Sequence, residues 1–168
     1  SYLRDKLTAD PLILFRIFHY PPQPATRAET EDWGVGEHTD YGLLTILRQD
    51  ECGGLQVTSQ SRWLDAVPIP AAFVGNIGDM LDRMPGGLYR PTPHRVRNAS
   101  GRGRLSFPFF FDPGFDAEIQ PVPTGHVACP ESESRWDHLN LHAFQGTYGD
   151  YVLEKVSKVF PDLGGKTL

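Results

Sequence analysis

Five residues stand out because their types and order suit metal chemistry. They occur in three short stretches, His38-Thr39-Asp40, then His94, then Arg104-Leu105-Ser106. Two imidazoles and one carboxylate form the ligand set of non-haem Fe(II) oxygenases, a set that leaves open positions on the metal. An arginine and a serine just downstream are suited to hold the far carboxylate of a chelating cosubstrate. The pattern therefore suggests both a metal and a second reactant.

The spacing of these residues is compatible with one shared site. His38 and Asp40 are two positions apart, and in an extended segment such residues point to the same side. His94 would come from a distant strand and complete a triangular set of ligands. A hard carboxylate with borderline imidazoles suits Fe(II), Mn(II) or Zn(II), so the residues alone leave the metal open. The His-x-Asp tripeptide is weak evidence by itself, because a chain with six histidines contains one easily by chance.

Arg104 adds a second constraint. Arg104 and Ser106 alternate on one face of a predicted strand, so both can point into the same cavity as His94 if the strands are neighbours. An arginine among apolar side chains inside a fold needs an anion as partner, because a buried unpaired charge is costly. The alternative is that Arg104 pairs with a structural aspartate or glutamate.

Short strands and frequent turns are predicted for most of the chain, which contains 15 prolines and 17 glycines. We expect strands at residues 12–20, 42–48, 55–58, 63–67, 72–76, 94–98 and 104–111, the first of them buried, and a helical turn at 78–84. Residues 1–9 are predicted to end a helix, 23–32 to form an exposed loop, 121–136 to be irregular and 141–160 to form a helix. The expected fold is mainly β, a jelly roll or barrel with a short N-terminal and a C-terminal helix.

Composition limits the function classes. A length of 168 residues suits one domain, and 39% hydrophobic with 22% charged residues is typical of a soluble globular protein. The net charge of −5 argues against nucleic acid as the main partner, and we find neither a membrane-spanning run nor a signal peptide. Cys52 and Cys129 do not make a disulfide framework, so the cytoplasm is the expected compartment. His19 is predicted to be a packed core residue.

Six motifs in a fixed order carry a family resemblance. They are Phe18-His19-Tyr20-Pro21-Pro22, Glu37-His38-Thr39-Asp40-Tyr41-Gly42-Leu43-Leu44-Thr45, Gly53-Gly54-Leu55-Gln56-Val57, Asn76-Ile77-Gly78-Asp79, His94-Arg95-Val96 and Arg104-Leu105-Ser106. With these motifs, residues 14–160 resemble the isopenicillin N synthase-like Fe(II)/2-oxoglutarate-dependent oxygenases. The resemblance implies a double-stranded β-helix, a jelly roll that holds the metal inside one mouth.

The resemblance also implies roles for individual residues. His38, Asp40 and His94 match the iron ligands, and Arg104 and Ser106 match the anchors of the 2-oxoglutarate distal carboxylate. Tyr20 matches a tyrosine that touches the cosubstrate in several relatives. The motif that ends at Asp79 resembles a structural turn, so Asp79 is given no catalytic role. The implied cofactors are Fe(II) and O2 with 2-oxoglutarate as cosubstrate, and ascorbate is a further candidate.

The implied reaction is the hydroxylation or desaturation of a small organic molecule, coupled to oxidative decarboxylation of 2-oxoglutarate to succinate. One alternative is an Fe(II)/O2 oxidase of the same fold that does not use 2-oxoglutarate, and another is a non-catalytic module or inactive fragment. Full members of the family carry a further N-terminal region, so residues 1–168 are expected to be a fragment that lacks it. The prime substrate and the oligomeric state are left open.

Overall fold

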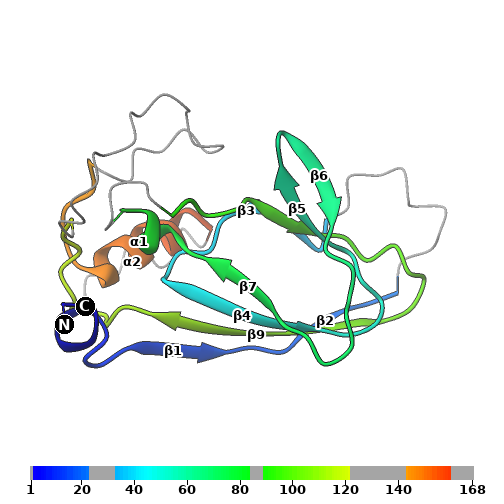
Figure 1. Ribbon diagram of the computed structural model, residues 1–168, viewed down its shortest axis with the longest axis horizontal. Coiled ribbons are helices and arrows are strands. Elements are labelled where there is room, and N and C mark those ends of the chain that lie inside the picture. Colours follow the sequence, from blue (N-terminus) through cyan, green and yellow to red (C-terminus); the bar gives the residue numbers. More distant parts are fainter. Residues whose placement is uncertain (1, 23–32, 84–88, 122–142, 160–168) are drawn as a thin grey trace.

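Two antiparallel sheets face each other and helices gather at one end of them (Figure 1). This computed structural model describes residues 2–22, 33–83, 89–121 and 143–159. The larger sheet has the order β1-β9-β4-β7, with β2 also paired to β9, and the smaller has the order β3-β8-β5-β6. The strands of the larger sheet are β1 (Leu12–Phe15), β2 (Phe18–Tyr20), β4 (Leu44–Gln49), β7 (Val74–Ile77) and β9 (Arg104–Asp112). Those of the smaller are β3 (Val35–His38), β5 (Leu55–Ser59), β6 (Arg62–Asp65) and β8 (His94–Val96). The predicted mainly β jelly roll is confirmed.

The single buried strand predicted at residues 12–20 is wrong in two respects. The segment forms two strands, because β1 pairs with residues 109–112 of β9 and β2 pairs with residues 104–106. Pro108 of β9 lies opposite the break, and proline has no N–H to donate to a ladder. In addition, all four residues of β1 are exposed. His19 on β2 is exposed as well, so its predicted core position is also wrong.

Three helices are present in the described residues: η1 (Leu3–Leu7), α1 (Asp79–Arg83) and α2 (Tyr148–Val159). The C-terminal helix begins later than predicted, after a capping box formed by Thr147 and Asp150. The Asp150 N–H donates to Thr147 Oγ1 over 3.1 Å, while the Thr147 N–H donates to Asp150 Oδ2 over 2.9 Å. The loop predicted at 23–32 and nearly all of the irregular segment predicted at 121–136 lie outside the described residues.

The apolar core has two parts. The first packs the helices against the start of β4 and consists of Leu7, Leu43, Met80, Ile119, Tyr148 and Tyr151. The second lies between the sheets and consists of Leu47, Leu55 and Val96. One cavity, lined by the predicted site residues, also touches both parts of the core, with Tyr148 from the first and Leu47, Leu55 and Val96 from the second.

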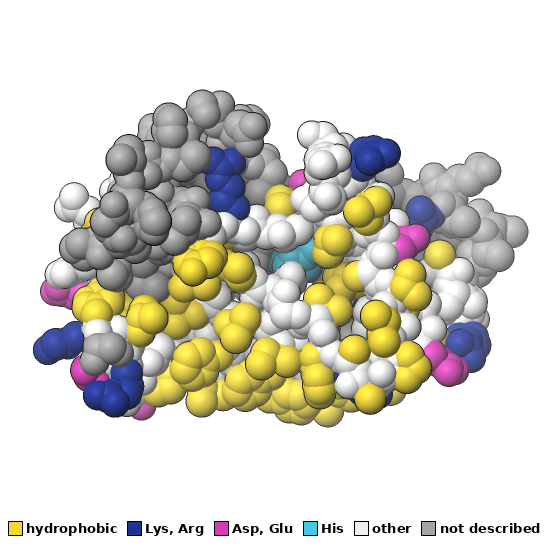
Figure 2. All heavy atoms as spheres, viewed as in Figure 1, with side chains coloured by type: hydrophobic (Ala, Val, Ile, Leu, Met, Phe, Trp, Pro, Cys, Tyr) yellow, Lys and Arg dark blue, Asp and Glu magenta, His cyan; other side chains and the backbone are white. Residues whose placement is uncertain are grey.

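The larger sheet carries an exposed apolar surface on the side away from the smaller sheet. We call it the outer apolar face and define it by Phe15, Leu44, Ile46 and Phe73, whose exposed fractions range from 37% to 64%. Figure 2 shows yellow side chains gathered over the lower part of the view, where Figure 1 places β1, β9 and β4. No helix among the described residues is both long and apolar enough to cross a membrane.

Candidate metal centre

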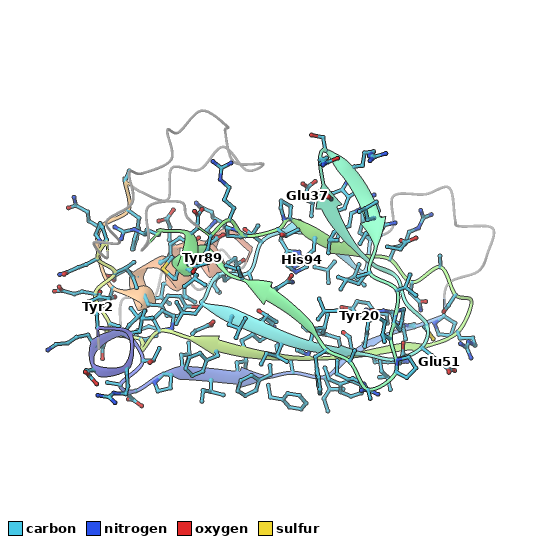
Figure 3. All side chains as sticks on the ribbon, in the orientation of Figure 1. Tyr2, Tyr20, Glu37, Glu51, Tyr89 and His94 are labelled. Carbon is cyan, nitrogen blue, oxygen red and sulfur yellow. The ribbon has the colours of Figure 1, made fainter. Side chains whose placement is uncertain are left out.

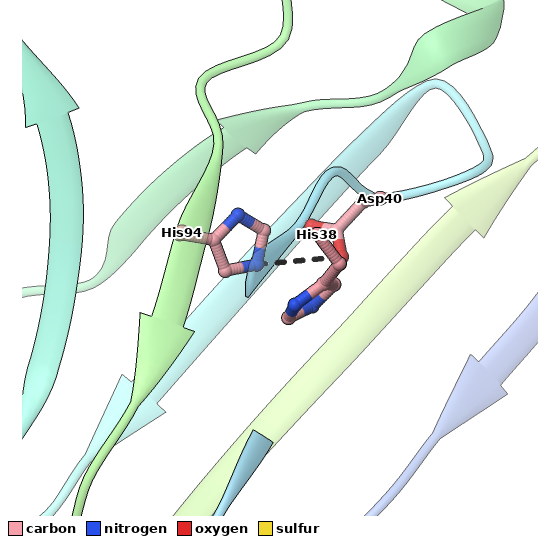
Figure 4. Close-up of side chains that lie close together, drawn as sticks. All are labelled: His38, Asp40 and His94. Atoms are coloured by element: carbon pink, nitrogen blue, oxygen red, sulfur yellow. Dashed lines mark ion pairs between the residues drawn. The ribbon is translucent and has the colours of Figure 1, made fainter. Parts of the chain in front are cut away.

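Strand pairing brings the two distant histidines of the predicted ligand set together. β3 and β8 are antiparallel, and His38 stands directly opposite His94 in their register. Asp40 follows two residues after His38, at the start of the turn into β4. Figure 4 shows His38 and Asp40 at the end of β3 with their side chains directed toward His94. The ladder between β3 and β8 therefore produces the triangular arrangement expected from the sequence.

The donor atoms of the triad lie close together. Asp40 Oδ1 is 3.6 Å from His94 Nε2 and 3.9 Å from His38 Nε2, and one ligand atom from each residue falls within 4.8 Å of the others. The other ring nitrogens face backbone carbonyl oxygens: His38 Nδ1 is 2.8 Å from Gly36 O and His94 Nδ1 is 3.1 Å from Thr92 O. Donation from Nδ1 to these carbonyls leaves the Nε2 lone pairs free for a metal.

Burial keeps the triad suited to bind a cation. His94 and Asp40 are buried, and His38 is half-buried at the open side. Desolvation lowers the pKa of His94; the His38 imidazole acts in the same direction, while the Asp40 carboxylate opposes it. A neutral imidazole is the form that binds a metal. Burial thus favours the metal-binding form of His94, beside the carboxylate of Asp40 and the imidazole of His38, and two imidazoles with one carboxylate are a donor set that suits a divalent iron ion.

The turn after β3, residues 39–43, is called the ligand turn after the predicted ligand Asp40, and it is tied to the end of β7. The Asp79 N–H donates to Asp40 O over 2.8 Å, and the Gly78 N–H donates to Leu43 O over 3.0 Å. A Cβ atom at Gly78 would lie 2.2 Å from Gly42 O, so only glycine permits this approach. The motif that the sequence predicted to be structural thus forms the support of the ligand turn.

Asp79 connects this support to the C-terminal helix. It is fully buried, and its carboxylate accepts hydrogen bonds from Thr39 Oγ1 over 2.8 Å and from Tyr151 OH over 2.6 Å. Lys155 Nζ lies 4.0 Å from the same carboxylate. Because Thr39 stands between two of the triad residues, helix α2 takes part in holding the ligand turn.

Arg104 is the largest fully buried side chain of the described residues. Its Nε donates to Gly53 O, its Nη2 is 3.5 Å from Gln49 Oε1, and its guanidinium carbon lies 4.8 Å from the centre of the Tyr20 ring. Its Nη1 has no hydrogen-bond partner within the described part of the chain, and none of the ion pairs between described residues includes Arg104. Such a buried cation, held by neutral groups and with one donor unsatisfied, fits a bound anion.

The triad and Arg104 line the same cavity, which has a volume of about 460 Å³. Figure 3 shows Tyr20 on the larger sheet and His94 on the smaller, both in the space between the sheets. Ser106 also lines the cavity and is buried beside Arg104 on β9. Figure 2 shows a histidine side chain (cyan) at the bottom of a hollow in this face of the molecule. All six residues predicted for the site, Tyr20, His38, Asp40, His94, Arg104 and Ser106, therefore meet in one place.

Residues 12–113 match the family model of the 2OG-Fe(II) oxygenase superfamily. The chain belongs to this superfamily. Its name states the metal and the cosubstrate that are characteristic of its members, Fe(II) and 2-oxoglutarate. The triad and the buried arginine described above lie within the matched region.

Similar proteins support the same assignment. A probable iron/ascorbate oxidoreductase of Dictyostelium discoideum is 54% identical over the whole chain and half of its own length. A 1-aminocyclopropane-1-carboxylate oxidase of Dictyostelium mucoroides is 41% identical over 96% of the chain and 52% of its own length. The crystal structure of a full-length Neurospora crassa protein in complex with alpha-KG and thymine superposes with a TM-score of 0.75 at 27% identity, over 94% of this chain and 47% of that one. The chain thus spans about half the length of these superfamily members.

Some site residues were not found from the sequence. Gln49 is buried on β4 and contacts Arg104, and its even spacing from Thr45 and Leu47 on the predicted strand could have indicated this. Asn76 is buried on β7 beside Asp40 and His94, although the sequence suggested only a structural turn there. The backbone oxygen of Gly53 that accepts from Arg104 has no sequence signal beyond the adjacent glycine.

Proposed function

We propose that this protein oxidises a small organic molecule with O2 in a reaction that requires Fe(II) and 2-oxoglutarate. For a hydroxylation, one substrate C–H bond, 2-oxoglutarate and O2 give the alcohol, succinate and CO2. The observation that carries the proposal is the Arg104 guanidinium, fully buried, with an unsatisfied Nη1, in the same cavity as a His-Asp-His triad. A dicarboxylate that reaches from the triad to this arginine would meet the requirements of both.

His38, Asp40 and His94 would hold the iron, which supplies the activation of O2 when bound. Arg104 would form a forked, charge-assisted pair with the distal carboxylate through Nη1 and Nη2. Its Nε already donates to Gly53 O, whereas Nη1 has no partner in the described residues and Nη2 carries a second N–H besides the one that faces Gln49. The Ser106 hydroxyl, buried on the same face of β9, would donate a further hydrogen bond to this carboxylate. Tyr20 would contribute its ring face against the guanidinium and keep the fork in place.

The cavity walls indicate the character of the reaction space. The wall opposite the smaller sheet is apolar and includes Leu14, Phe18, Pro108 and Phe110. Such a wall excludes water from the reacting atoms, which limits unproductive side reactions. Asp112 lies at the helical end of the cavity, where burial raises the pKa of its carboxyl and Tyr148 OH donates to it over 2.7 Å.

Two further expectations belong to this proposal. We infer that additional chain completes the substrate pocket, which is supported by the relatives' twofold greater length and by the exposure of β1 beside the cavity. We also infer a reducing compartment, the cytoplasm, where the half-buried Cys52 remains a free thiol. Ascorbate is proposed as an auxiliary reductant, in line with the name of the Dictyostelium discoideum relative.

The test measures metal binding, cosubstrate binding and succinate formation with the same preparation. We expect one Mn(II) per chain, 2-oxoglutarate binding that depends on the metal, and slow succinate formation with Fe(II) and O2 even without prime substrate. His94→Ala should lose stoichiometric metal binding. Metal binding without 2-oxoglutarate binding would favour the Fe(II)/O2 oxidase, and a chain that binds no metal would be a non-catalytic module.

A further inference from the structure

Asn76 occupies the space between two members of the triad. It is the third residue of β7, where it pairs with Thr45 of β4, and it is only 7% exposed. Its Nδ2 is 3.4 Å from Asp40 Oδ2 and also 3.4 Å from each ring nitrogen of His94. No other side-chain amide of the described residues contacts two triad members.

The contact with Asp40 is the directional one. An amide nitrogen equally far from both nitrogens of an imidazole lies beside the ring rather than in line with either lone pair, and His94 Nδ1 already faces Thr92 O. A carboxylate offers only acceptors, so the amide must present its NH2 group and not its oxygen to Asp40. Asn76 therefore donates to Asp40 and packs against His94.

This contact makes the two oxygens of Asp40 different. Oδ1 faces the two Nε2 atoms at 3.6 and 3.9 Å, whereas Oδ2 faces the Asn76 amide. We propose that Asn76 is a positioning residue that restricts Asp40 to binding the metal through one oxygen. The proposal rests on the metal site of the proposed function, and it assigns Asn76 a role that its place in a structural turn did not suggest.

The number of carboxylate oxygens on the metal matters for this site. Three protein ligands leave open positions for exchangeable ligands, and a carboxylate that binds through both oxygens would take one of those positions. A neutral amide can hold the second oxygen away without adding charge to the site. A lysine or arginine in the same place would compete with the cation for the carboxylate.

The matched variants for the test lie next to each other on β7. Asn76→Leu keeps a similar side-chain volume and removes the N–H donors. The control is Ile77→Ala, which shortens the next side chain on β7. Because successive side chains point to opposite faces of a strand, this variant measures the effect of loosening β7 without removing the Asn76 amide. Mn(II) affinity is measured from the electron paramagnetic resonance signal of free Mn(II), and Asp40 geometry from crystals of each chain grown with Mn(II). Melting temperatures of the metal-free chains show whether each variant is folded.

We expect Asn76→Leu to weaken Mn(II) binding by about 10- to 100-fold, the range typical for a group that orients a metal ligand. Its crystals should show both Asp40 oxygens on Mn(II) or a rotated carboxylate, while Ile77→Ala binds Mn(II) like the unsubstituted chain. Should Asn76→Leu not fold, Asn76→Ser, whose hydroxyl is too short to reach Asp40, is expected to give the same result. The proposal is wrong if a folded Asn76→Leu chain keeps its Mn(II) affinity and still binds Mn(II) through one Asp40 oxygen. It is also wrong if Ile77→Ala loses as much Mn(II) affinity as Asn76→Leu. Either result would leave the metal site itself standing. Absence of Mn(II) binding by the unsubstituted chain would overturn the metal site and this proposal together.

Discussion

Replacement of Arg104 by lysine tests whether this residue recognises the distal carboxylate of the cosubstrate. The guanidinium is fully buried, with Nε on Gly53 O and with Nη1 lacking a partner in the described part of the chain. Lysine keeps the positive charge but replaces the rigid fork by a single ammonium group. Arg104→Lys therefore removes one of the two proposed hydrogen bonds to the carboxylate while the site remains cationic.

The size of the effect follows from this geometry. A hydrogen bond to a charged group contributes about 1.5–3 kcal/mol, and 1.4 kcal/mol corresponds to a factor of about ten, so 2-oxoglutarate binding should weaken roughly 10- to 150-fold. Binding of 2-oxopentanoate, which has a methyl group where 2-oxoglutarate has the distal carboxylate, should change little. In Arg104→Lys, the ratio of the 2-oxoglutarate affinity to the 2-oxopentanoate affinity should therefore be smaller than in the unsubstituted chain by the same factor.

The assay is isothermal titration calorimetry of each keto acid into the Mn(II)-loaded chain. Mn(II) affinity is the internal control, because Arg104 is not among the three residues whose donor atoms cluster. If Arg104→Lys leaves the ratio of the two affinities unchanged, Arg104 does not contact the distal carboxylate and the reasoning fails. If the variant loses Mn(II) as well, the substitution has disturbed the whole site and Arg104 is structural.

Three further outcomes follow from the site and its support. Gly78→Ala places a methyl group 2.2 Å from a backbone oxygen and should cost about 1–3 kcal/mol in the free energy of unfolding, whereas Gly75→Ala, with nothing within 4 Å, should be nearly neutral in the same urea titration. Tyr151→Phe removes a 2.6 Å hydrogen bond to the buried Asp79 carboxylate and should cost about 1.5–3 kcal/mol; a loss below about 0.5 kcal/mol would show that the contact is unimportant. Burial lowers the pKa of His94 in the folded chain below its ordinary value of 6.5, so the unfolded chain binds more protons and metal-free stability should fall as pH drops below about 6.5. A stability curve that is flat from about pH 7.5 to 5 would contradict this assignment.

The sequence was sufficient for the fold class and for naming six residues that the structure brings to one cavity, because local motifs indicate both. The alternation of Arg104 and Ser106 on β9 can be recognised without tertiary information, and so can the two-residue spacing of His38 and Asp40. The capping box at Thr147 was also present in the sequence, although the apolar spacing alone extended the helix too far toward the N-terminus.

What the sequence did not reveal depends on partners far away in the chain. The break after β1 lies opposite Pro108 of β9, and no local feature of residues 12–20 predicts it. The same apolar run was expected to be buried, yet the sheet leaves it at an exposed edge. β3 was not predicted as a strand, because its pairing with β8 and not its composition makes it extended. Asn76 acquires its position only when β7 and β8 come together.

The connection from Thr39 through Asp79 to Tyr151 has a consequence for the order in which the molecule assembles. Tyr151 is 72 residues from Asp79, and Tyr2 at the other end bonds to Glu118, 116 residues away, beside the same core. Contacts of such long sequence separation form late, because loop-closure entropy opposes them until most of the chain has collapsed. A ribosome must therefore release helix α2 before the ligand turn reaches its final shape. If the triad holds the metal as proposed, we therefore expect tight metal binding to require helix α2, and a chain interrupted before residue 151 would contain the triad without the support that orients it.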